Sequence, residues 1–249
     1  MIASIKKIAL VGGTHGGELT GIFLVKKFQQ SPHLIERYGF ETVTFISNEK
    51  AVEVGTRYID IDLNRAFNRQ DLKNPQLTNY EQSLAKKIAQ RIEEEKIDLI
   101  LDLHSTTSNM GLTLILHGDN PDLLKMAGYL TQTNSKVRIL QHKLNKQASY
   151  LISSVELGIT IEVGAIANGE LAARNELGEI LAMILPKLQF QDYQPLNPGN
   201  PIFITFDGEE IFYQGNETVY PVFINEAAYY EKGTAMCLTV ISEQLGIKS

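Results

Sequence analysis

Short apolar segments that alternate with helical patterns constrain the fold of this chain most. Residues 8–11 and 97–101 are apolar on both faces, which is typical of strands buried inside a sheet. Residues 19–28 carry apolar side chains at mixed three- and four-residue spacing, which predicts a helix with one apolar stripe. This alternation predicts an α/β sheet covered by helices. The other predicted strands are residues 43–46, 112–116, 137–140 and 159–163.

Two more helices are predicted from local signals. Thr78 and Glu81 have the spacing of a capping box, and apolar residues follow at every fourth position up to Ile92, so a helix should run to about Lys96. Residues 176–185 form a second candidate helix, which Pro186 would end.

The pattern changes at Pro186, after which prolines, glycines and short β-rich segments dominate. We therefore expect a three-layer α/β/α domain with a mixed sheet over residues 1–186. A small β-rich domain over residues 187–249 should cover the active site. Its predicted strands are residues 202–206, 210–213, 219–224 and 235–241.

Composition excludes several classes of protein. The chain has 249 residues, of which 43% are hydrophobic, and this indicates a globular protein. A formal charge of −6 argues against a nucleic-acid partner. No apolar run is long enough to span a membrane, the N-terminus does not resemble a signal peptide, and a single cysteine rules out an internal disulfide. We therefore expect a cytoplasmic protein with a small-molecule substrate. A homo-oligomer is compatible with these features.

Three side chains that can bind metals or transfer protons stand at or near the ends of predicted strands: His15, His104 and Glu162. Ligands of open α/β sheets bind at the carboxyl ends of strands. Glu18 lies three residues after His15, so both can face one side of a turn. Together with His104 they form a set typical of catalytic zinc. The alternatives are a loop histidine and a carboxylate that stabilises a helix N-terminus.

Further candidates surround this set. Asp102 is expected to orient a histidine, and Glu162 sits in an apolar strand, where a lone carboxylate is costly unless paired or functional. Residues 57–65 contain two arginines and an asparagine, which suit carboxylate binding. The alternative for this segment is a solvated loop with salt bridges from Asp60 and Asp62. The glycine-rich turn around His15 does not match a nucleotide-binding loop.

Several motifs occur together in a recognisable order. They are GGTHGGE at residues 12–18, TRYIDIDLNRAF at 56–67, DLHSTTSNMG at 102–111, IEVG at 161–164 and YPVFINEAAYYEK at 220–232. The sequence resembles the aspartoacylase and succinylglutamate desuccinylase family, which is related to the zinc carboxypeptidases. The match runs from about Ile8 to Lys232.

The resemblance implies a role for each matching residue. His15, Glu18 and His104 would hold one zinc ion per chain. Glu162 would be the general base that activates the zinc-bound water, and Arg57 would polarise the scissile carbonyl and stabilise the oxyanion. Asn64 and Arg65 would bind a substrate carboxylate. Tyr229 would reach the substrate from the C-terminal region, and Glu226 would support that region.

The implied activity is zinc-dependent hydrolysis of the amide bond of an N-acyl amino acid, with N-acetyl-L-aspartate as the leading substrate. Two departures bear on specificity. Residues 146–153 lack the arginine found before the catalytic glutamate in relatives that act on N-acetylaspartate, and the stretch from Glu162 to Pro195 is shorter. N-succinyl or aromatic N-acetyl amino acids therefore remain alternatives, as does a zinc-containing binding protein without turnover. Cobalt or manganese could also occupy the metal site.

Overall fold

The chain divides into two compact units. The first comprises residues 1–105 and 113–162, and the second comprises residues 106–112 and 163–249. The computed structural model describes residues 5–142, 148–165, 172–174, 180–184, 188, 191–204, 209–224, 226 and 235–241.

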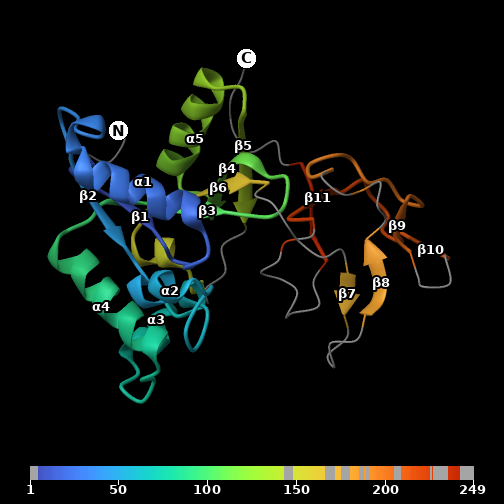
Figure 1. The fold of residues 1–249 in the computed structure, drawn as a ribbon. Coiled ribbons are helices and arrows are strands. Elements are labelled where there is room, and N and C mark those ends of the chain that lie inside the picture. Colours follow the sequence, from blue (N-terminus) through green and yellow to red (C-terminus); the bar gives the residue numbers. More distant parts are fainter. Residues whose placement is uncertain are drawn as a thin grey trace. The chain divides into compact units, whose positions relative to one another are not determined.

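A six-stranded sheet in the order β2-β1-β3-β6-β4-β5 forms the centre of the fold (Figure 1). Strand β1 pairs in parallel with both β2 and β3. Only residues 106–110 separate β3 from β4, too few for the crossover that a parallel strand would need. Strand β4 therefore runs opposite to β3, and the sheet is mixed, as predicted. The strands are β1 (Lys7–Gly12), β2 (Glu41–Ile46), β3 (Leu99–Ser105), β4 (Gly111–His117), β5 (Val137–His142) and β6 (Leu157–Gly164).

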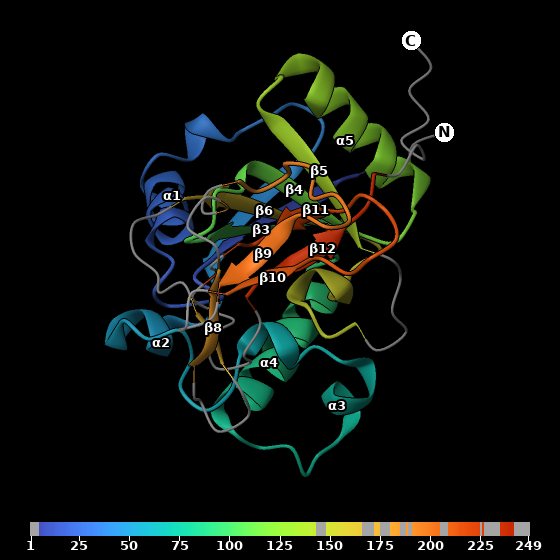
Figure 2. The same ribbon diagram turned by 90° about the vertical axis from the view of Figure 1, so that its right-hand side faces the viewer.

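Helices cover both faces of this sheet, which confirms the predicted layered α/β class (Figures 1 and 2). Helix α4 packs on one face, in a core cluster that includes Val11, Ile88 and Ile100. Helix α5 packs on the other face, against a second cluster that includes Leu99 and Leu116. The helices are α1 (Leu19–Gln30), α2 (Glu49–Val54), α3 (Arg69–Lys73), α4 (Tyr80–Glu94) and α5 (Pro121–Thr133), with short 3₁₀ turns η1 (Pro32–Leu34), η2 (Leu63–Arg65) and η3 (Leu151–Ser154).

Helix α1 lies unusually close to the sheet. A β-carbon on Gly21 would stand 2.4 Å from the carbonyl oxygen of Leu103, and one on Gly12 would stand 2.5 Å from the carbonyl oxygen of Gly21. Both contacts are shorter than atoms tolerate, so glycine is required at the two positions. This close approach fixes the turn of residues 13–18 between β1 and α1, which carries two of the predicted metal ligands.

Helix α4 begins differently from the prediction. Its N-cap is Asn79 rather than Thr78, and Asn79 forms a reciprocal capping box with Gln82. An asparagine side chain caps a helix at least as well as threonine does, so the capping box shifts by one residue. The shift leaves Glu81 outside the box, and its side chain is fully buried.

The second unit is rich in short strands, and here one prediction is wrong. Residues 180–184 belong to strand β8 (Ile180–Ile184), not to a helix over residues 176–185. The run is short and apolar, so its periodicity does not distinguish a helix from a strand, and pairing with two neighbouring strands decides in favour of the strand. The unit also contains β7 (Ala172–Arg174), β9 (Pro201–Ile204), β10 (Glu210–Phe212), β11 (Tyr220–Val222) and β12 (Cys237–Thr239).

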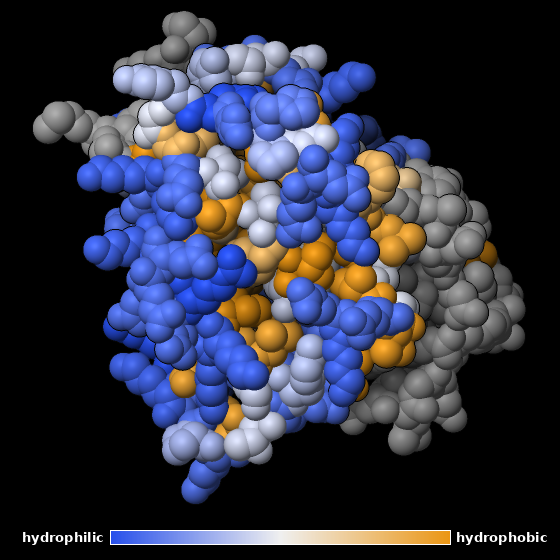
Figure 3. Space-filling model, turned by 60° about the vertical axis from the view of Figure 1, so that its left-hand side comes forward, coloured by the Kyte–Doolittle hydropathy of each residue, from blue (hydrophilic) through white to orange (hydrophobic). Residues whose placement is uncertain are grey.

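One face of the molecule is mostly hydrophilic (Figure 3). Hydrophobic side chains gather near the centre of this face. Leu19 and Phe23, one turn apart on α1, are among the exposed apolar residues. None of the helices in the described parts of the chain has the length and apolar character needed to cross a bilayer.

Candidate metal centre and active site

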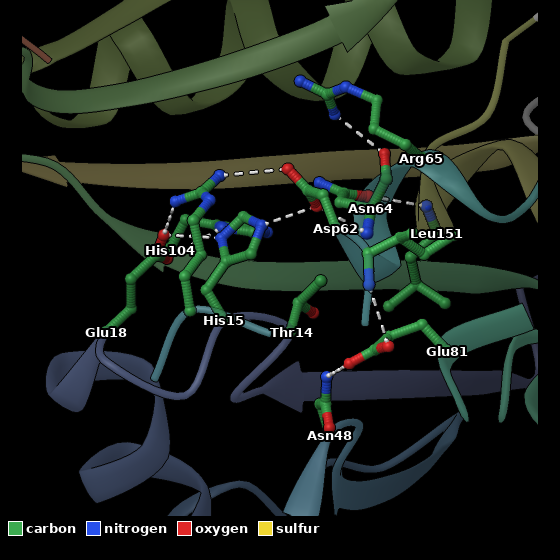
Figure 4. Close-up of polar contacts among 12 residues, drawn as sticks. Thr14, His15, Glu18, Asn48, Asp62, Asn64, Arg65, Glu81, His104 and Leu151 are labelled. Atoms are coloured by element: carbon green, nitrogen blue, oxygen red, sulfur yellow. Dashed lines mark hydrogen bonds and ion pairs between the residues drawn. The ribbon is translucent and has the colours of Figure 1, made fainter. Parts of the chain in front are cut away.

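His15, Glu18 and His104 converge at the carboxyl ends of two paired strands (Figure 4). His15 and Glu18 lie on the turn after β1, and His104 is the penultimate residue of β3. One donor atom from each residue lies within 4.8 Å of the donor atoms of the other two. Two imidazole nitrogens and one carboxylate form a ligand set that suits catalytic zinc. The structure thus brings together the three residues predicted as metal ligands.

Glu18 bridges the two histidines. Its Oε1 lies 2.6 Å from His15 Nδ1, and its Oε2 lies 2.8 Å from His104 Nδ1. Burial alone would raise the pKa of Glu18, but the nearby His15 and His104 outweigh it and hold that pKa well below its usual range. Burial would likewise lower the pKa of His104, but the carboxylates of Asp102 and Glu18 raise it well above normal. The three groups therefore form a charged cluster in which both histidines are buried and Glu18 is partly buried.

Each histidine contacts a second carboxylate through its other ring nitrogen. His104 Nε2 lies 2.8 Å from Asp102 Oδ2, which agrees with the predicted orienting role of Asp102. His15 Nε2 lies 3.0 Å from Asp62 Oδ1. Such partners fix the ring orientation of metal-binding histidines and leave Nδ1 directed at the site. The arrangement therefore suits a metal site with supporting carboxylates.

Asp62 was not singled out by the sequence, where it was interpreted as a partner in a solvated loop. The structure instead places it against a buried histidine. Burial would raise the pKa of Asp62, but the hydrogen bond from His15 and the positive charges of Arg57 and Arg65 hold it far below its usual value. The only available signal was its position in the arginine-rich segment, and Asp60 shares that position. The sequence alone does not separate the two.

Arg57 stands beside the metal-ligand cluster. Its Nη1 donates to Glu18 Oε1 at 3.3 Å, and its Nη2 donates to Asp62 Oδ2 at 3.4 Å. The guanidinium is therefore held by two carboxylates that also contact the histidines. A cation in this place is suited to stabilise negative charge that develops next to the metal ligands.

Asn64 and Arg65 follow on the turn η2. Asn64 is buried, and its Oδ1 accepts a hydrogen bond of 2.9 Å from the backbone N–H of Leu151. Arg65 donates to the carbonyl oxygen of Asn64 at 2.8 Å, and its guanidinium carbon lies 4.9 Å from the centre of the Tyr150 ring. Within residues 5–142 and 148–165, no carboxylate forms an ion pair with Arg65. Its charge is thus available for an anionic group.

Glu162 lies on β6, the strand next to β3 in the sheet, and is 7% exposed. Because side chains alternate along a strand, Glu162 points away from the cluster that contains Ile159 and Ile161. His104 likewise points away from the face of Leu99 and Leu101, so both polar residues lie on the same face of the sheet. The predicted general base therefore shares a sheet face with a predicted metal ligand.

The remaining predicted residues lie elsewhere. Tyr229 is outside the described residues. Glu226 accepts hydrogen bonds from the hydroxyl of Thr106 and, at 3.1 Å, from the backbone N–H of Thr107, within the second unit. This contact agrees with the supporting role predicted for it. The polar sequence surroundings of His117 and His142 predict surface residues; His142 is exposed, His117 is partly exposed, and their rings stack with centres 5.1 Å apart at the ends of β4 and β5.

Comparison with known proteins identifies matching domains and relatives. Residues 4–186 match the succinylglutamate desuccinylase/aspartoacylase catalytic domain, and residues 172–241 match the AstE/AspA barrel-sandwich hybrid domain. A probable aspartoacylase of Nostoc sp. is 45% identical, over 94% of this chain and 96% of the relative. Aspartoacylase of Rattus norvegicus is 37% identical, over 94% of this chain and 92% of the relative.

A solved structure agrees with these relatives. Murine aminoacylase 3 superposes with a TM-score of 0.84 at 28% identity, covering 94% of both chains. The alignment with the Nostoc protein spans 282 positions, more than the 249 residues of this chain, so that relative contains residues without a counterpart here. The resemblance inferred from the sequence motifs is confirmed: the chain belongs to the succinylglutamate desuccinylase/aspartoacylase family.

Proposed function

We propose that this protein is a zinc-dependent amidohydrolase that cleaves an N-acyl amino acid into a carboxylate and a free amino acid. The observation that carries the proposal is the cluster of His15, Glu18 and His104 with Arg57 bound to the same Glu18. The names of the aspartoacylase relatives and of aminoacylase 3 support this reaction class.

His15, Glu18 and His104 would hold the metal, and Asp62 and Asp102 would keep the two imidazoles oriented toward it. A bound zinc ion supplies a Lewis acid and lowers the pKa of water. Chain residues carry out the proton transfers. Glu162 takes a proton from the attacking water as the new carbon–oxygen bond forms, and it delivers a proton to the departing amine nitrogen as the carbon–nitrogen bond breaks.

The arginines have separate tasks in this proposal. Arg57 is held beside Glu18 and stabilises the negative charge that grows on the carbonyl oxygen in the transition state. Arg65 binds the carboxylate of the amino acid, since it has no ion-pair partner in the described first unit. Asn64 uses its Oδ1 for the backbone, which leaves its amide N–H groups to donate to the same carboxylate. Tyr229 would add a further substrate contact.

N-Acetyl-L-aspartate is the leading substrate in this proposal, because motifs along most of the chain match aspartoacylases. A second carboxylate on the substrate needs a second cation; residues 146–153 contain no arginine, so Lys143, Lys146 or Arg138 would have to bind it. An N-acyl amino acid with a neutral or aromatic side chain is therefore the principal alternative. A binding protein without turnover is the alternative from a different class.

The test is amine release by zinc-loaded protein from a panel of N-acyl amino acids. The panel contains N-acetyl-L-aspartate, N-acetyl-L-phenylalanine and an N-succinyl amino acid. Turnover of N-acetyl-L-aspartate supports the full proposal. Turnover of only the other compounds supports the hydrolase but assigns it a different substrate. No release from any compound contradicts the enzyme and favours the binding protein.

Glu162→Gln separates chemistry from binding. The amide keeps the size of the side chain but cannot accept the proton, so turnover should be lost while the metal content remains one ion per chain. The matched control is Glu156→Gln, just before the same strand and outside the proposed site. It should keep wild-type turnover. Equal activity of Glu162→Gln and the wild type would remove Glu162 from its proposed role.

A further inference from the structure

The fully buried carboxylate of Glu81 contacts the backbone of the active-site loop, residues 57–65. Glu81 lies in the first turn of α4 and is 0% exposed. Its Oε1 accepts the backbone N–H of Ile59 at 2.7 Å, and its Oε2 accepts those of Asp60 and Ile61 at 2.9 and 3.1 Å. Figure 4 shows Glu81 next to the segment that carries Asp62 and Asn64.

The same carboxylate reaches a second segment. Asn48 donates its side-chain N–H to Glu81 Oε1 at 3.2 Å, and its own Oδ1 accepts the backbone N–H of Ala51 in the first turn of α2. The loop also bonds to α4 in the opposite direction: Asp60 Oδ2 accepts the backbone N–H of Tyr80, in the first turn of α4, at 2.8 Å. Glu81 therefore lies at a junction that ties α4, the N-terminus of α2 and the active-site loop together.

Burying a carboxylate is costly unless its oxygens accept enough hydrogen bonds. The four donors meet that need, and three of them are consecutive N–H groups of one loop. The anchored residues lie between Arg57 on one side and Asp62, Asn64 and Arg65 on the other. A shift of this backbone would move all four side chains at once.

We propose that Glu81 is a positioning residue: its buried carboxylate fixes residues 59–61 and thereby sets the place of Arg57 and Asp62 against Glu18 and His15. The catalytic part of this inference rests on the proposed hydrolase function. Glu81 itself touches neither the predicted metal ligands nor Arg57, and it acts through the loop.

The geometry calls for a carboxylate rather than an amide. Each oxygen of Glu81 faces two N–H donors, Asn48 and Ile59 at Oε1, Asp60 and Ile61 at Oε2. In a glutamine, the NH₂ group would replace one of the oxygens, and donors would face donors in either orientation. The Glu81→Gln variant keeps the size of the side chain and loses half of the anchor.

The matched control is Gln82→Ala. Gln82 is the next residue on α4 and accepts the N–H of Asn79 in the capping box, so its loss weakens the same helix without touching the loop. Amide hydrogen exchange of Ile59, Asp60 and Ile61 reports directly whether their N–H groups are hydrogen-bonded to Glu81, and this measurement does not depend on activity. We expect faster exchange at these three amides in Glu81→Gln and wild-type exchange in Gln82→Ala.

Kinetics then test the positioning role with the substrate found in the panel. A misplacement of about 1 Å far from the reacting atoms can reduce turnover on the order of 100-fold. We expect kcat/KM of Glu81→Gln to fall on the order of 10- to 100-fold at unchanged metal content. In an Arg57→Ala background the same change should cost less, because one of the four displaced side chains is already gone. A merely structural role would reduce activity equally in both backgrounds.

The outcomes separate this inference from the proposed function. An active wild type with equal kcat/KM in Glu81→Gln would overturn the positioning role alone, even if hydrogen exchange accelerates. Equal losses of activity in both backgrounds would also overturn it. A wild type that is inactive on the whole panel overturns the proposed hydrolase and, with it, the catalytic part of this inference. The exchange experiment would still report whether Glu81 anchors the loop.

Discussion

Replacement of Asp62 by asparagine should weaken metal binding, although Asp62 is not one of the proposed metal ligands. Asp62 Oδ1 lies 3.0 Å from His15 Nε2. A hydrogen bond from Nε2–H to this carboxylate keeps the proton on Nε2 and leaves the lone pair on Nδ1, which faces the proposed metal site. Loss of such an outer partner typically costs 10- to 100-fold in metal affinity or activity, or about 1.4 to 2.7 kcal/mol. The amide of asparagine still offers one oxygen acceptor. We therefore expect about 10-fold weaker binding for Asp62→Asn and about 100-fold for Asp62→Ala.

The assay is zinc titration of metal-free protein in competition with a chromophoric chelator at neutral pH. Asp98→Asn is the control, because Asp98 accepts two backbone N–H groups, those of Lys6 and Lys7, and contacts no histidine. It should bind zinc with wild-type affinity. Asp62→Asn should also lower kcat, because Asp62 holds Arg57 as well. Unchanged zinc affinity in both Asp62 variants would refute the argument from orientation.

Three further predictions concern catalysis, packing and pH. Arg57→Ala should lower kcat on the order of 10²- to 10³-fold at unchanged zinc content, measured by amine release and metal analysis. Leu63→Ala should lower the free energy of unfolding by about 2 to 5 kcal/mol in urea, because Leu63 is fully buried in the core under the active-site loop. Burial, assisted by the charges of His142 and Arg65, lowers the pKa of His117 to about 4. The unfolded chain, with a histidine pKa of about 6.5, then binds more protons than the folded protein between these values. Stability contributed by neutral His117 should therefore fall as the pH drops from about 6.5 toward 4, by at most about 1.4 kcal/mol per pH unit. Thermal unfolding of metal-free protein at pH 7 and pH 5 should show a smaller loss for His117→Phe than for the wild type; equal losses would contradict the shift.

The central strands could be predicted because burial on both faces leaves an unambiguous apolar run. Strands β1 and β3 follow this rule. Helix α5 was not predicted, although Asn120 caps it; its buried residues include the small Ala127 and Gly128 beside Leu123. The helix predicted over residues 176–185 was wrong at residues 180–184, because the periodicity of a short apolar run does not distinguish a helix from a strand. Only the neighbouring strands decide such a case.

Some residues of the candidate site could be predicted from the sequence and others could not. The convergence of the three proposed metal ligands could be predicted because strand ends and a three-residue spacing bring them together. Asp60 and Asp62 lie two residues apart in the same segment, yet one accepts from the backbone of α4 and the other contacts His15. Glu81 fits a capping-box pattern but accepts from a loop 20 to 22 positions earlier. Partners of this kind depend on the packing of separate segments, which local sequence does not encode.

The pairing of β1 with β3 has a consequence for how the protein is made. His15 and Glu18 are synthesised before His104, which follows 86 residues after Glu18. The ligand set cannot close until β3 has been synthesised and has paired with β1. Until His104 has been added, the nascent chain contains only two of the three proposed metal ligands. Capture of the metal would then mark the moment at which the centre of the sheet has assembled.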